Sequence, residues 1–302
     1  MHVVILSARS GWHTQELSRA LAERGHVAAV LPYESLVARF GPGLERAELS
    51  SEQVPVLDAD AVLARIIPHG SLEQIVYRLD ALHWLERRGV PVMNSPKAIE
   101  RSVDKFYTNA LLHEAGLPTP ETVVCEKIED ALHAVRAFGD AVIKPLFGSM
   151  GLGMVRVSDE DTAFRVVRAL EQARVVYYVQ RMIPNDGADI RVFVLGRRVF
   201  AAIERQAAPP EWRANVARGA TARPFELPAE WEALAVKAAA AVNADYAGVD
   251  LLPSRDGGVF VLEVNGIPGW QGLQQTTGLD VAGSIVDHLI ECVLPARAEQ
   301  ST

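Results

Sequence analysis

The segment Gly248–Asn265 constrains this chain most, because its pattern predicts a β-hairpin with polar residues on one face. Two apolar stretches flank Asp256-Gly257, a pair that is favoured in two-residue hairpin turns. If these two residues form the turn, the register of the strands places Asp250 directly opposite Glu263. Two carboxylates are then expected side by side on one face of the ribbon.

The same alternation predicts a third polar side chain on that face, from Asn265. The opposite face is apolar and is expected to enter a core; it consists of Val249, Leu251, Leu262 and Val264. Oxygen ligands of this kind suit Mg²⁺ that is bound to substrate phosphates, and they do not suit zinc. We therefore predict a metal site formed by Asp250, Glu263 and Asn265. The alternative is a surface hairpin whose acids merely face solvent.

Length and composition limit the classes of protein to which the chain can belong. It has 302 residues, of which 49% are hydrophobic and 23% charged, as in a soluble globular protein of one large or two to three small domains. The formal charge of -8 argues against broad electrostatic binding to nucleic acid or anionic lipid. No apolar run reaches the roughly 20 residues of a membrane span, and the N-terminus reads directly into a strand. We expect a cytoplasmic protein with neither nucleic acid nor membrane among its partners.

The two cysteines, Cys125 and Cys292, lie far apart and outside any Cys-x-x-Cys spacing. Neither a disulfide framework nor a zinc site is therefore supported. We expect both to be inert thiols.

Residues 1–94 predict a parallel α/β layer. The expected strands are 2–8, 26–31, 61–67 and 90–93, and the expected helices are 14–23 and 72–88. The first turn, 7–12, lacks the Gly-x-Gly-x-x-Gly pattern of dinucleotide-binding domains. Ser95 as N-cap and Pro96 at the first helical position begin a new helical segment, which marks the first predicted domain boundary.

The rest of the chain predicts two further α+β domains, 95–183 and 184–302. The middle one is expected to contain strands 121–125, 141–145, 154–157 and 175–180 with helices 105–115, 129–138 and 163–173. The last one is expected to contain strands 189–195 and 199–206, the hairpin, and helices 228–242 and 281–293. The segment 181–184 is interpreted as the hinge between them.

A glycine-rich stretch, 147–153, follows an apolar strand that ends near Lys144. The backbone N–H groups of such a loop can bind phosphate oxygens, and a neighbouring lysine supplies a positive charge for the same group. The loop could close as a lid. The spacing is not that of a Walker A motif, because no Gly-Lys-Ser/Thr follows and the loop opens no helix. By itself the pattern is weak, and an ordinary flexible hairpin is an equal interpretation.

Further charged residues follow a recognisable order along the chain. Lys105 lies on a predicted helix, and Asp189 and Arg191 share one face of a strand. Arg205, Arg213 and Asn215 come next. Each of these alone is typical of a surface ion pair or a loop charge. In their order they resemble the ATP-grasp superfamily, and the segments 180–191, 263–273 and 277–283 are similar to the RimK-type glutamate ligases.

This resemblance covers nearly the whole chain and implies a fold. It implies an ATP-grasp architecture with α/β and α+β parts, in which an N-terminal parallel α/β domain precedes two α+β subdomains that clasp ATP. The predicted domains are thus 1–94, 95–183 with the glycine-rich lid, and 184–302 with the metal-binding hairpin.

The resemblance also implies a role for each matching residue. Lys105 and Lys144 would contact the ATP phosphates. The other nucleotide-binding residues would be Gly148, Ser149, Met150, Gly151, Gly153, Gln180, Arg181, Met182, Ile183 and Asp189. Mg²⁺, or alternatively Mn²⁺, would bind Asp250, Glu263 and Asn265. The acyl-phosphate and amino-acid side would consist of Arg191, Arg205, Arg213 and Asn215. Arg181 departs from the Gln-Glu of the family's hinge, which bears on the adenine or ribose contacts.

The implied activity is that of an ATP-dependent carboxylate–amine ligase. An acceptor carboxylate would attack the γ-phosphate of ATP, and the amine of L-glutamate would displace phosphate from the resulting acyl phosphate. The acceptor would be a pterin-type cofactor, as in the branch associated with tetrahydromethanopterin, or a protein C-terminus. Arg65 and His69, which follow a strand of the first domain, are candidates for reading the acceptor carboxylate.

Two other functions stay open from sequence. One is a non-catalytic ATP-grasp module that only binds nucleotide, which the presence of the predicted metal ligands and arginines disfavours. The other is a ligase for a different amino acid, such as a dipeptide-forming enzyme. The oligomeric state also stays open, a homo-oligomer included.

Overall fold

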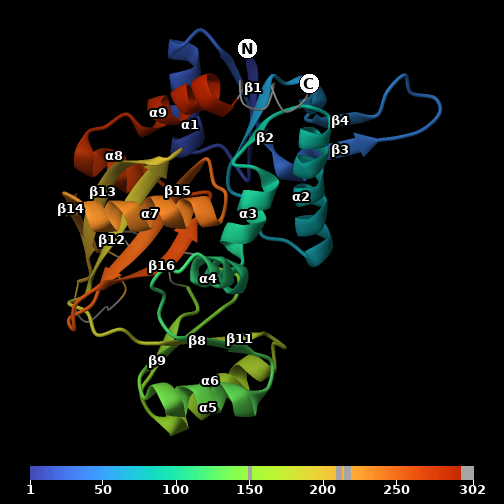
Figure 1. The fold of residues 1–302 in the computed structure, drawn as a ribbon. Coiled ribbons are helices and arrows are strands. Elements are labelled where there is room, and N and C mark those ends of the chain that lie inside the picture. Colours follow the sequence, from blue (N-terminus) through green and yellow to red (C-terminus); the bar gives the residue numbers. More distant parts are fainter. Residues whose placement is uncertain (149–151, 209–212, 214–218, 294–302) are drawn as a thin grey trace. The chain divides into compact units, whose positions relative to one another are not determined.

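A computed structural model of the chain describes residues 1–148, 152–208, 213 and 219–293 (Figure 1). The chain divides into two compact units. Unit 1 comprises Met1–Glu100, Asn243–Ala247 and Gly266–Thr302, and unit 2 comprises Arg101–Val242 and Gly248–Asn265. The predicted hairpin therefore belongs to unit 2, while the residues directly before and after it belong to unit 1. The predicted division into 1–94, 95–183 and 184–302 stays a prediction.

Unit 1 contains a parallel sheet of order β2-β1-β6-β7. Its strands are β1 (His2–Ser7), β2 (Val27–Pro32), β6 (Ala61–Ala64) and β7 (Val92–Met93). The connecting helices are α1 (Trp12–Glu23), after β1, and α2 (Leu72–Arg87), after β6. The central strands read as continuous apolar runs because all of β6 and nearly all of β1 is buried. Near the C-terminal end, α9 (Val281–His288) packs against α1 and continues into a π-helical turn, Leu289–Val293.

The sequence did not predict a second, three-stranded antiparallel sheet in unit 1. It consists of β3 (Leu36–Arg39), β4 (Glu48–Ser51) and β5 (Val54–Pro55), bordered by short 3₁₀ turns at Tyr33–Ser35 and Val56–Asp58. The β4–β5 turn places Glu52 and Gln53 at φ values of 49° and 68°. Tight turns with positive φ usually contain Gly or Asn, so no turn signature marked this hairpin. The short helix α8 (Gln271–Thr277) was also missed.

The first sheet of unit 2 is antiparallel and has the order β10-β9-β11-β8. Its strands are β8 (Thr122–Cys125), β9 (Ala141–Lys144), β10 (Val155–Val157) and β11 (Tyr177–Arg181). Ile143 and Val179 lie in a core with residues of α5 (Ile128–Phe138) and α6 (Glu160–Glu171). The two helices therefore cover one face of this sheet (Figure 1).

Two helices precede this sheet where the sequence predicted one continuous helical segment. They are α3 (Pro96–Val103) and α4 (Lys105–Glu114). Asp104 separates them, because its carboxylate accepts a hydrogen bond from the Tyr107 N–H at 3.1 Å and so caps α4. Lys105 is thus the first residue of a helix.

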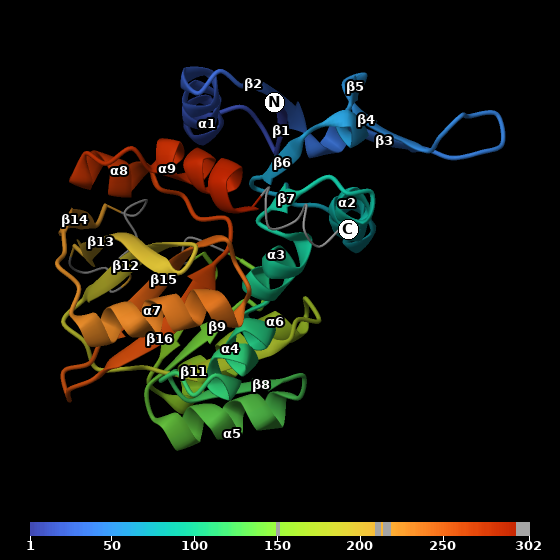
Figure 2. The same cartoon turned by 45° about the horizontal axis from the view of Figure 1, so that its top comes forward.

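The second sheet of unit 2 has the order β14-β13-β12-β15-β16. Its strands are β12 (Ala188–Leu195), β13 (Arg198–Gln206), β14 (Thr221–Pro224), β15 (Tyr246–Pro253) and β16 (Val259–Asn265). The alanine-rich helix α7 (Ala229–Ala241) packs against β12, β13 and β16 (Figure 2). Among the described residues of both units, none of the helices is long and apolar enough to cross a membrane.

The predicted hairpin is formed by β15 and β16, and Asp250 lies opposite Glu263 as predicted. The predicted two-residue turn is wrong, since the Ser254 N–H donates to the Gly258 carbonyl at 3.1 Å and three residues lie between them. This shifts the pairing by one residue. A bulge at Leu262 shifts it back before the carboxylates are reached.

The bulge also changes which residues of the hairpin are buried. Leu262 was expected to be buried, but it is only half-buried. The fully buried Val261 takes its place, together with the predicted Val249, Leu251 and Val264. Glu263 and Asn265 lie two residues apart beyond the bulge and therefore share a face, as predicted.

Candidate active site

Five charged residues of unit 2 meet on neighbouring strands of the second sheet. Asp189 and Arg205 are a direct cross-strand pair of β12 and β13, and Asp250 and Glu263 are a direct pair of β15 and β16. Arg191 lies on β12, two residues after Asp189 and hence on the same face. Because the sheet order is β13-β12-β15-β16, the arginines and carboxylates form a continuous row.

Asp250 is bound by two arginines at once. Arg191 pairs with it through Nε to Oδ1 and through Nη2 to Oδ2, the latter at 2.8 Å. Arg205 Nη2 lies 3.0 Å from Asp250 Oδ2. Arg205 also binds Asp189 in bidentate fashion, at 2.6 and 2.8 Å. Arg191 Nη2 lies 3.8 Å from Glu263 Oε1, so the row contains two guanidinium groups and three carboxylates.

Burial and charge act in opposite directions on these carboxylates. Burial alone would raise the pKa of Asp250, but the adjacent Arg191 and Arg205 outweigh it and lower that pKa below its ordinary value. Burial, with repulsion from Asp250, raises the pKa of Asp189 against the opposing charge of Arg205. The bidentate pair with Arg205 favours the ionised form of Asp189. Glu263 is 44% exposed and is the most accessible acid of the row.

Two lysines of unit 2 belong to the same electrostatic environment. Lys144, at the end of β9, donates from Nζ to Gln180 Oε1 at 2.5 Å. Desolvation lowers the pKa of Lys144 to about 8, although the charge of Glu263 acts to raise it. Lys105 donates to the Gly148 carbonyl at 2.7 Å, and burial lowers its pKa against the same pull from Glu263. The lysines and the hairpin carboxylate are thus close enough to influence one another.

Comparison with known proteins identifies the family. A sequence model of the RimK-like ATP-grasp domain matches residues 102–289, and one of the RimK PreATP-grasp domain matches residues 1–99. The chain belongs to the RimK-like ATP-grasp family. It is 35% identical to the tetrahydromethanopterin:alpha-L-glutamate ligase of Methanosarcina acetivorans, over 92% of this chain and 95% of the relative. It is also 35% identical to a probable alpha-L-glutamate ligase of Shewanella amazonensis, over 95% of this chain and 94% of the relative.

Solved structures agree with the ATP-grasp fold of this RimK-like ligase. The ATP-grasp ligase PsnB, complexed with a minimal precursor, has a TM-score of 0.75 at 22% identity and covers 95% of this chain and 98% of its own. A RimK domain ATP-grasp protein from Sphaerobacter thermophilus has a TM-score of 0.72 at 25% identity, covering 96% of this chain and 100% of its own. The predicted fold class, with its α/β and α+β parts, is confirmed. The protein is a ligase that forms C–N bonds.

The ligase's donor set at the hairpin fits a divalent cation. Two carboxylates, from Asp250 and Glu263, and the amide of Asn265 are hard oxygen donors on one face, which suits Mg²⁺. In the described part of the chain no three His, Cys, Asp or Glu side chains are grouped so that they could hold a metal. The predicted site does not require such a group, because its two acids would leave the remaining positions to water and phosphate oxygens.

Four of the ligase's predicted site residues lie outside the described residues. They are Ser149, Met150, Gly151 and Asn215. Arg213 is described and half-buried.

Gly148 and Gly153, at the two ends of the predicted phosphate loop, adopt φ values of 153° and 74°. A Cβ on either residue would lie 3.2 to 3.4 Å from Pro145, so both positions favour glycine.

Two N–H groups of the predicted hinge donate to backbone carbonyls of unit 2. The Arg181 N–H donates to Glu121 O at 2.8 Å and the Met182 N–H to Asp140 O at 2.9 Å. The Arg181 guanidinium pairs with the Glu121 carboxylate at 2.7 Å. An adenine contact from Arg181 or Met182 would therefore use their carbonyls. The Ile183 carbonyl accepts from Asn185 Nδ2 at 2.8 Å.

The prediction that Arg65 reads an acceptor carboxylate is wrong. Its side chain is 2% exposed, and its guanidinium donates to the Tyr246 hydroxyl and to the Pro268 carbonyl, each at 3.0 Å. It also lies 4.4 Å from the centre of the Trp270 ring. Arg65 therefore joins parts of unit 1 that are distant in sequence. His69 is exposed, and its predicted role stays a prediction.

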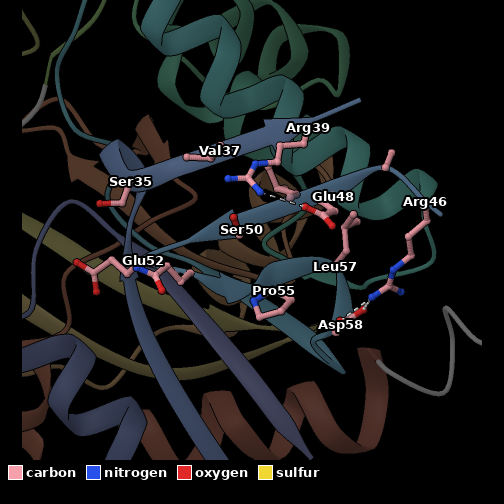
Figure 3. A pocket seen from close by; sticks show the side chains of 13 residues that line it. Ser35, Val37, Arg39, Arg46, Glu48, Ser50, Glu52, Pro55, Leu57 and Asp58 are labelled. Carbon is pink, nitrogen blue, oxygen red and sulfur yellow. Dashed lines mark hydrogen bonds and ion pairs between the residues drawn. The ribbon is translucent and has the colours of Figure 1, made fainter. Parts of the chain in front are cut away.

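Unit 1 contains a pocket of about 570 Å³ that is separate from the predicted site. It lies along β3, β4 and β5 and is lined by thirteen residues between Ser35 and Asp58 (Figure 3). Four of its five charged side chains form ion pairs, Arg46 with Asp58 at 2.7 Å and Arg39 with Glu48 at 3.9 Å, and the fifth, Glu52, is exposed. None of the predicted binding residues lines it, so it is not the candidate active site.

Proposed function

We propose that this ligase uses Mg²⁺ and ATP to activate a carboxylate of an acceptor and then joins that carboxylate to the amine of L-glutamate. The observation that supports it is the row of arginines around Asp250 and Glu263, within the electrostatic reach of Lys105 and Lys144. Mg²⁺, held by Asp250, Glu263 and Asn265, would neutralise negative charge on the phosphates.

The chain's own residues suit each part of that reaction. Lys105 and Lys144 provide point charges for the phosphates of ATP. The acceptor carboxylate oxygen bonds to the γ-phosphorus while the bond to ADP breaks, which gives an acyl phosphate. The glutamate nitrogen then bonds to the acyl carbon, phosphate leaves and the nitrogen loses a proton. Arg191 and Arg205 are assigned the stabilisation of negative charge that develops on the acyl oxygen.

L-Glutamate is the proposed amino acid because the relatives at 35% identity are named for it. The acceptor is less narrowly defined. One relative is named for tetrahydromethanopterin, and the other name gives no acceptor. The ATP-grasp ligase PsnB has been solved in complex with a precursor peptide. A pterin-type cofactor and a protein or peptide carboxylate are therefore the two acceptors to compare.

The proposal predicts ADP release that depends on three substrates together. ATP, L-glutamate and the correct acceptor should give ADP at a rate well above that of any pair, with an acceptor product heavier by one or more glutamyl residues. The assay is run with Mg²⁺, then with Mn²⁺, and with D-glutamate, L-aspartate and L-glutamine as controls. ADP release with another amino acid alone would support a dipeptide-forming enzyme, and tight ATP binding without turnover would support a nucleotide-binding module.

We further propose that the acceptor binds to unit 1 at the carboxyl ends of β1 and β6. The strand order β2-β1-β6-β7 reverses direction between these two strands, since β1 leads through α1 to β2 and β6 leads through α2 to β7. Open α/β sheets bind ligands at such a point. The two strand-end loops are joined there by a hydrogen bond from the Ala8 N–H to the Ile66 carbonyl, 2.9 Å long. Arg9, on the first loop, is exposed and can take the role that Arg65 cannot.

Arg9→Ala should raise the KM for the acceptor roughly ten-fold, the scale of a charged hydrogen bond, and leave the KM for ATP unchanged. The matched control is Arg87→Ala, because Arg87 is also exposed but lies at the far end of α2, away from these loops. Steady-state kinetics with both substrates varied distinguishes the cases. Equal effects of the two variants, or a parallel change in the KM for ATP, would contradict this location.

A further inference from the structure

Three polar side chains form a hydrogen-bonded chain that ends on Lys144. Thr122 lies on β8, Gln180 on β11 and Lys144 on β9, which are neighbouring strands of the first sheet of unit 2. Gln180 is the direct cross-strand partner of Thr122, and Tyr178 that of Lys144. Side-chain alternation therefore places all of them on the face opposite to α5 and α6 (Figure 1).

The donors and acceptors in this chain fix the orientation of the Gln180 amide. Thr122 Oγ1 donates its one proton to the Pro120 carbonyl at 2.8 Å. Its oxygen must then accept from Gln180 Nε2, which lies 3.0 Å away. The amide oxygen is consequently turned toward Lys144, whose ammonium can only donate, at 2.5 Å. A rotated amide would set two donors against each other.

We propose that Thr122 and Gln180 are positioning residues that hold the ammonium of Lys144 for the nucleotide phosphates. Gln180 is 3% exposed, so its amide is shielded from solvent that could compete for Lys144. The amide is also neutral. It fixes the direction of one of the three ammonium N–H groups, and it leaves the positive charge and two donors for a phosphate. The proposal rests on the phosphate-binding role proposed for Lys144.

A purely structural function of the same hydrogen bonds is the alternative. In that case Thr122 and Gln180 would stabilise the sheet, and their substitution would lower the free energy of unfolding without acting on the nucleotide selectively. The two interpretations differ in which kinetic constant changes and in whether the change requires Lys144.

Thr122 allows a direct test by conservative substitution. Thr122→Val keeps the shape but removes the hydroxyl, so Gln180 Nε2 keeps only its longer contact, 3.4 Å to the Tyr178 hydroxyl. We expect the KM for ATP to rise roughly five- to ten-fold, the range of one to one and a half kcal/mol in a single hydrogen bond, while the KM for glutamate is unchanged. Thr122→Ser keeps the hydroxyl and should restore wild-type kinetics. Equal KM values for ATP in the valine variant and the wild type, or a serine variant as impaired as the valine variant, would overturn the proposal.

A double-mutant cycle separates this proposal from the role of Lys144 itself. Gln180→Met, Lys144→Met and the combination are compared by calorimetric titration with Mg·ADP, and unfolding in urea confirms that each variant folds. We expect Gln180→Met to weaken binding roughly ten-fold in the wild type and not at all in the Lys144→Met background. Additive effects would indicate that Gln180 contacts the nucleotide directly, as the family resemblance implies, and would contradict its positioning role. Unchanged binding in Lys144→Met would instead contradict the proposed function of that lysine.

Gln180→Glu provides an independent check because it is nearly isosteric. A carboxylate at this position would pair with the ammonium and cancel the charge that the phosphates need. We expect weaker Mg·ADP binding than in Gln180→Met, with a folded protein of comparable stability. Binding as tight as in the wild type would show that the neutrality of the side chain has no importance.

Discussion

Glu263→Gln is expected to lower kcat/KM for ATP by at least about 100-fold while the protein stays fully folded. Residues that merely support a metal ligand typically contribute about 10- to 100-fold in metal affinity, and Glu263 would be a ligand itself. Its side chain is 44% exposed and its contact with Arg191 is long, at 3.8 Å, so its charge contributes little to stability. The loss should be partly recovered at high Mg²⁺ concentration, because the defect is one of affinity.

The measurement is a titration of ADP release against Mg²⁺ at saturating ATP, together with calorimetric binding of Mg·ADP. The matched control is Glu230→Gln on α7, which removes an exposed acid of the same unit outside the charged row. Wild-type Mg²⁺ dependence in Glu263→Gln would show that the hairpin does not hold the metal. Asp250→Asn is less suitable for this test, since it also takes a carboxylate from the buried Arg205 and the half-buried Arg191.

The hairpin of β15 and β16 shows both what sequence patterns predict and what they miss. The pairing of Asp250 with Glu263 was predicted correctly, although the turn was not, because the bulge at Leu262 cancels the one-residue shift that the longer turn introduces. Turn type depends on backbone dihedral angles, and bulges leave no reliable trace in an alternating pattern. The carboxylates therefore lie on the predicted face, although the sequence pattern predicted neither the longer turn nor the bulge.

The polar chain at Lys144 could not be predicted because it depends on strand order. Thr122, Lys144 and Gln180 each occupy a polar position in a predicted strand. The pairing of β8 with β11 and of β11 with β9 joins segments up to 58 residues apart, and nothing local specifies which strands become neighbours. Period-two alternation gives the face of each side chain but not its partner. The sequence therefore indicated Lys144 and Gln180 separately and missed the hydrogen bonds that join them to each other and to Thr122.

The prediction for Arg65 was wrong because the sequence indicated its position at a strand end but not its burial. It follows β6 at the carboxyl edge of the sheet, where ligand-binding residues are common. Its partner at Pro268 lies 203 residues away in sequence. Only the tertiary fold shows that the return of the chain to unit 1 buries this guanidinium against a carbonyl and an indole ring. A cationic side chain at a strand end can therefore be assigned to ligand binding only when its burial is known.

Arg205→Met is expected to destabilise the protein by about 3–5 kcal/mol, the cost of breaking a buried ion pair from one side. Arg205 is 6% exposed, and its loss leaves Asp189 without its bidentate partner and Asp250 with only Arg191. Both carboxylates would then be desolvated with too little compensating charge. Their folded-state pKa values should rise above the unfolded values, so that the folded state binds more protons. The stability of this variant should accordingly fall as the pH rises and recover as the pH is lowered toward 5.

The double variant Arg205→Met/Asp189→Asn is the matched comparison, because it removes the stranded carboxylate together with the arginine. Replacing both members of a buried pair is often nearly neutral, so at least half of the lost stability should return. Urea unfolding of the wild type and of both variants at pH 7 and pH 5 gives the free energies directly. A loss below about 1 kcal/mol in Arg205→Met, or no recovery in the double variant, would contradict the buried network as described. If Asp189→Asn alone keeps ADP release, a double variant that regains stability but not ADP release would show that the reaction requires the Arg205 guanidinium even where the fold no longer depends on it.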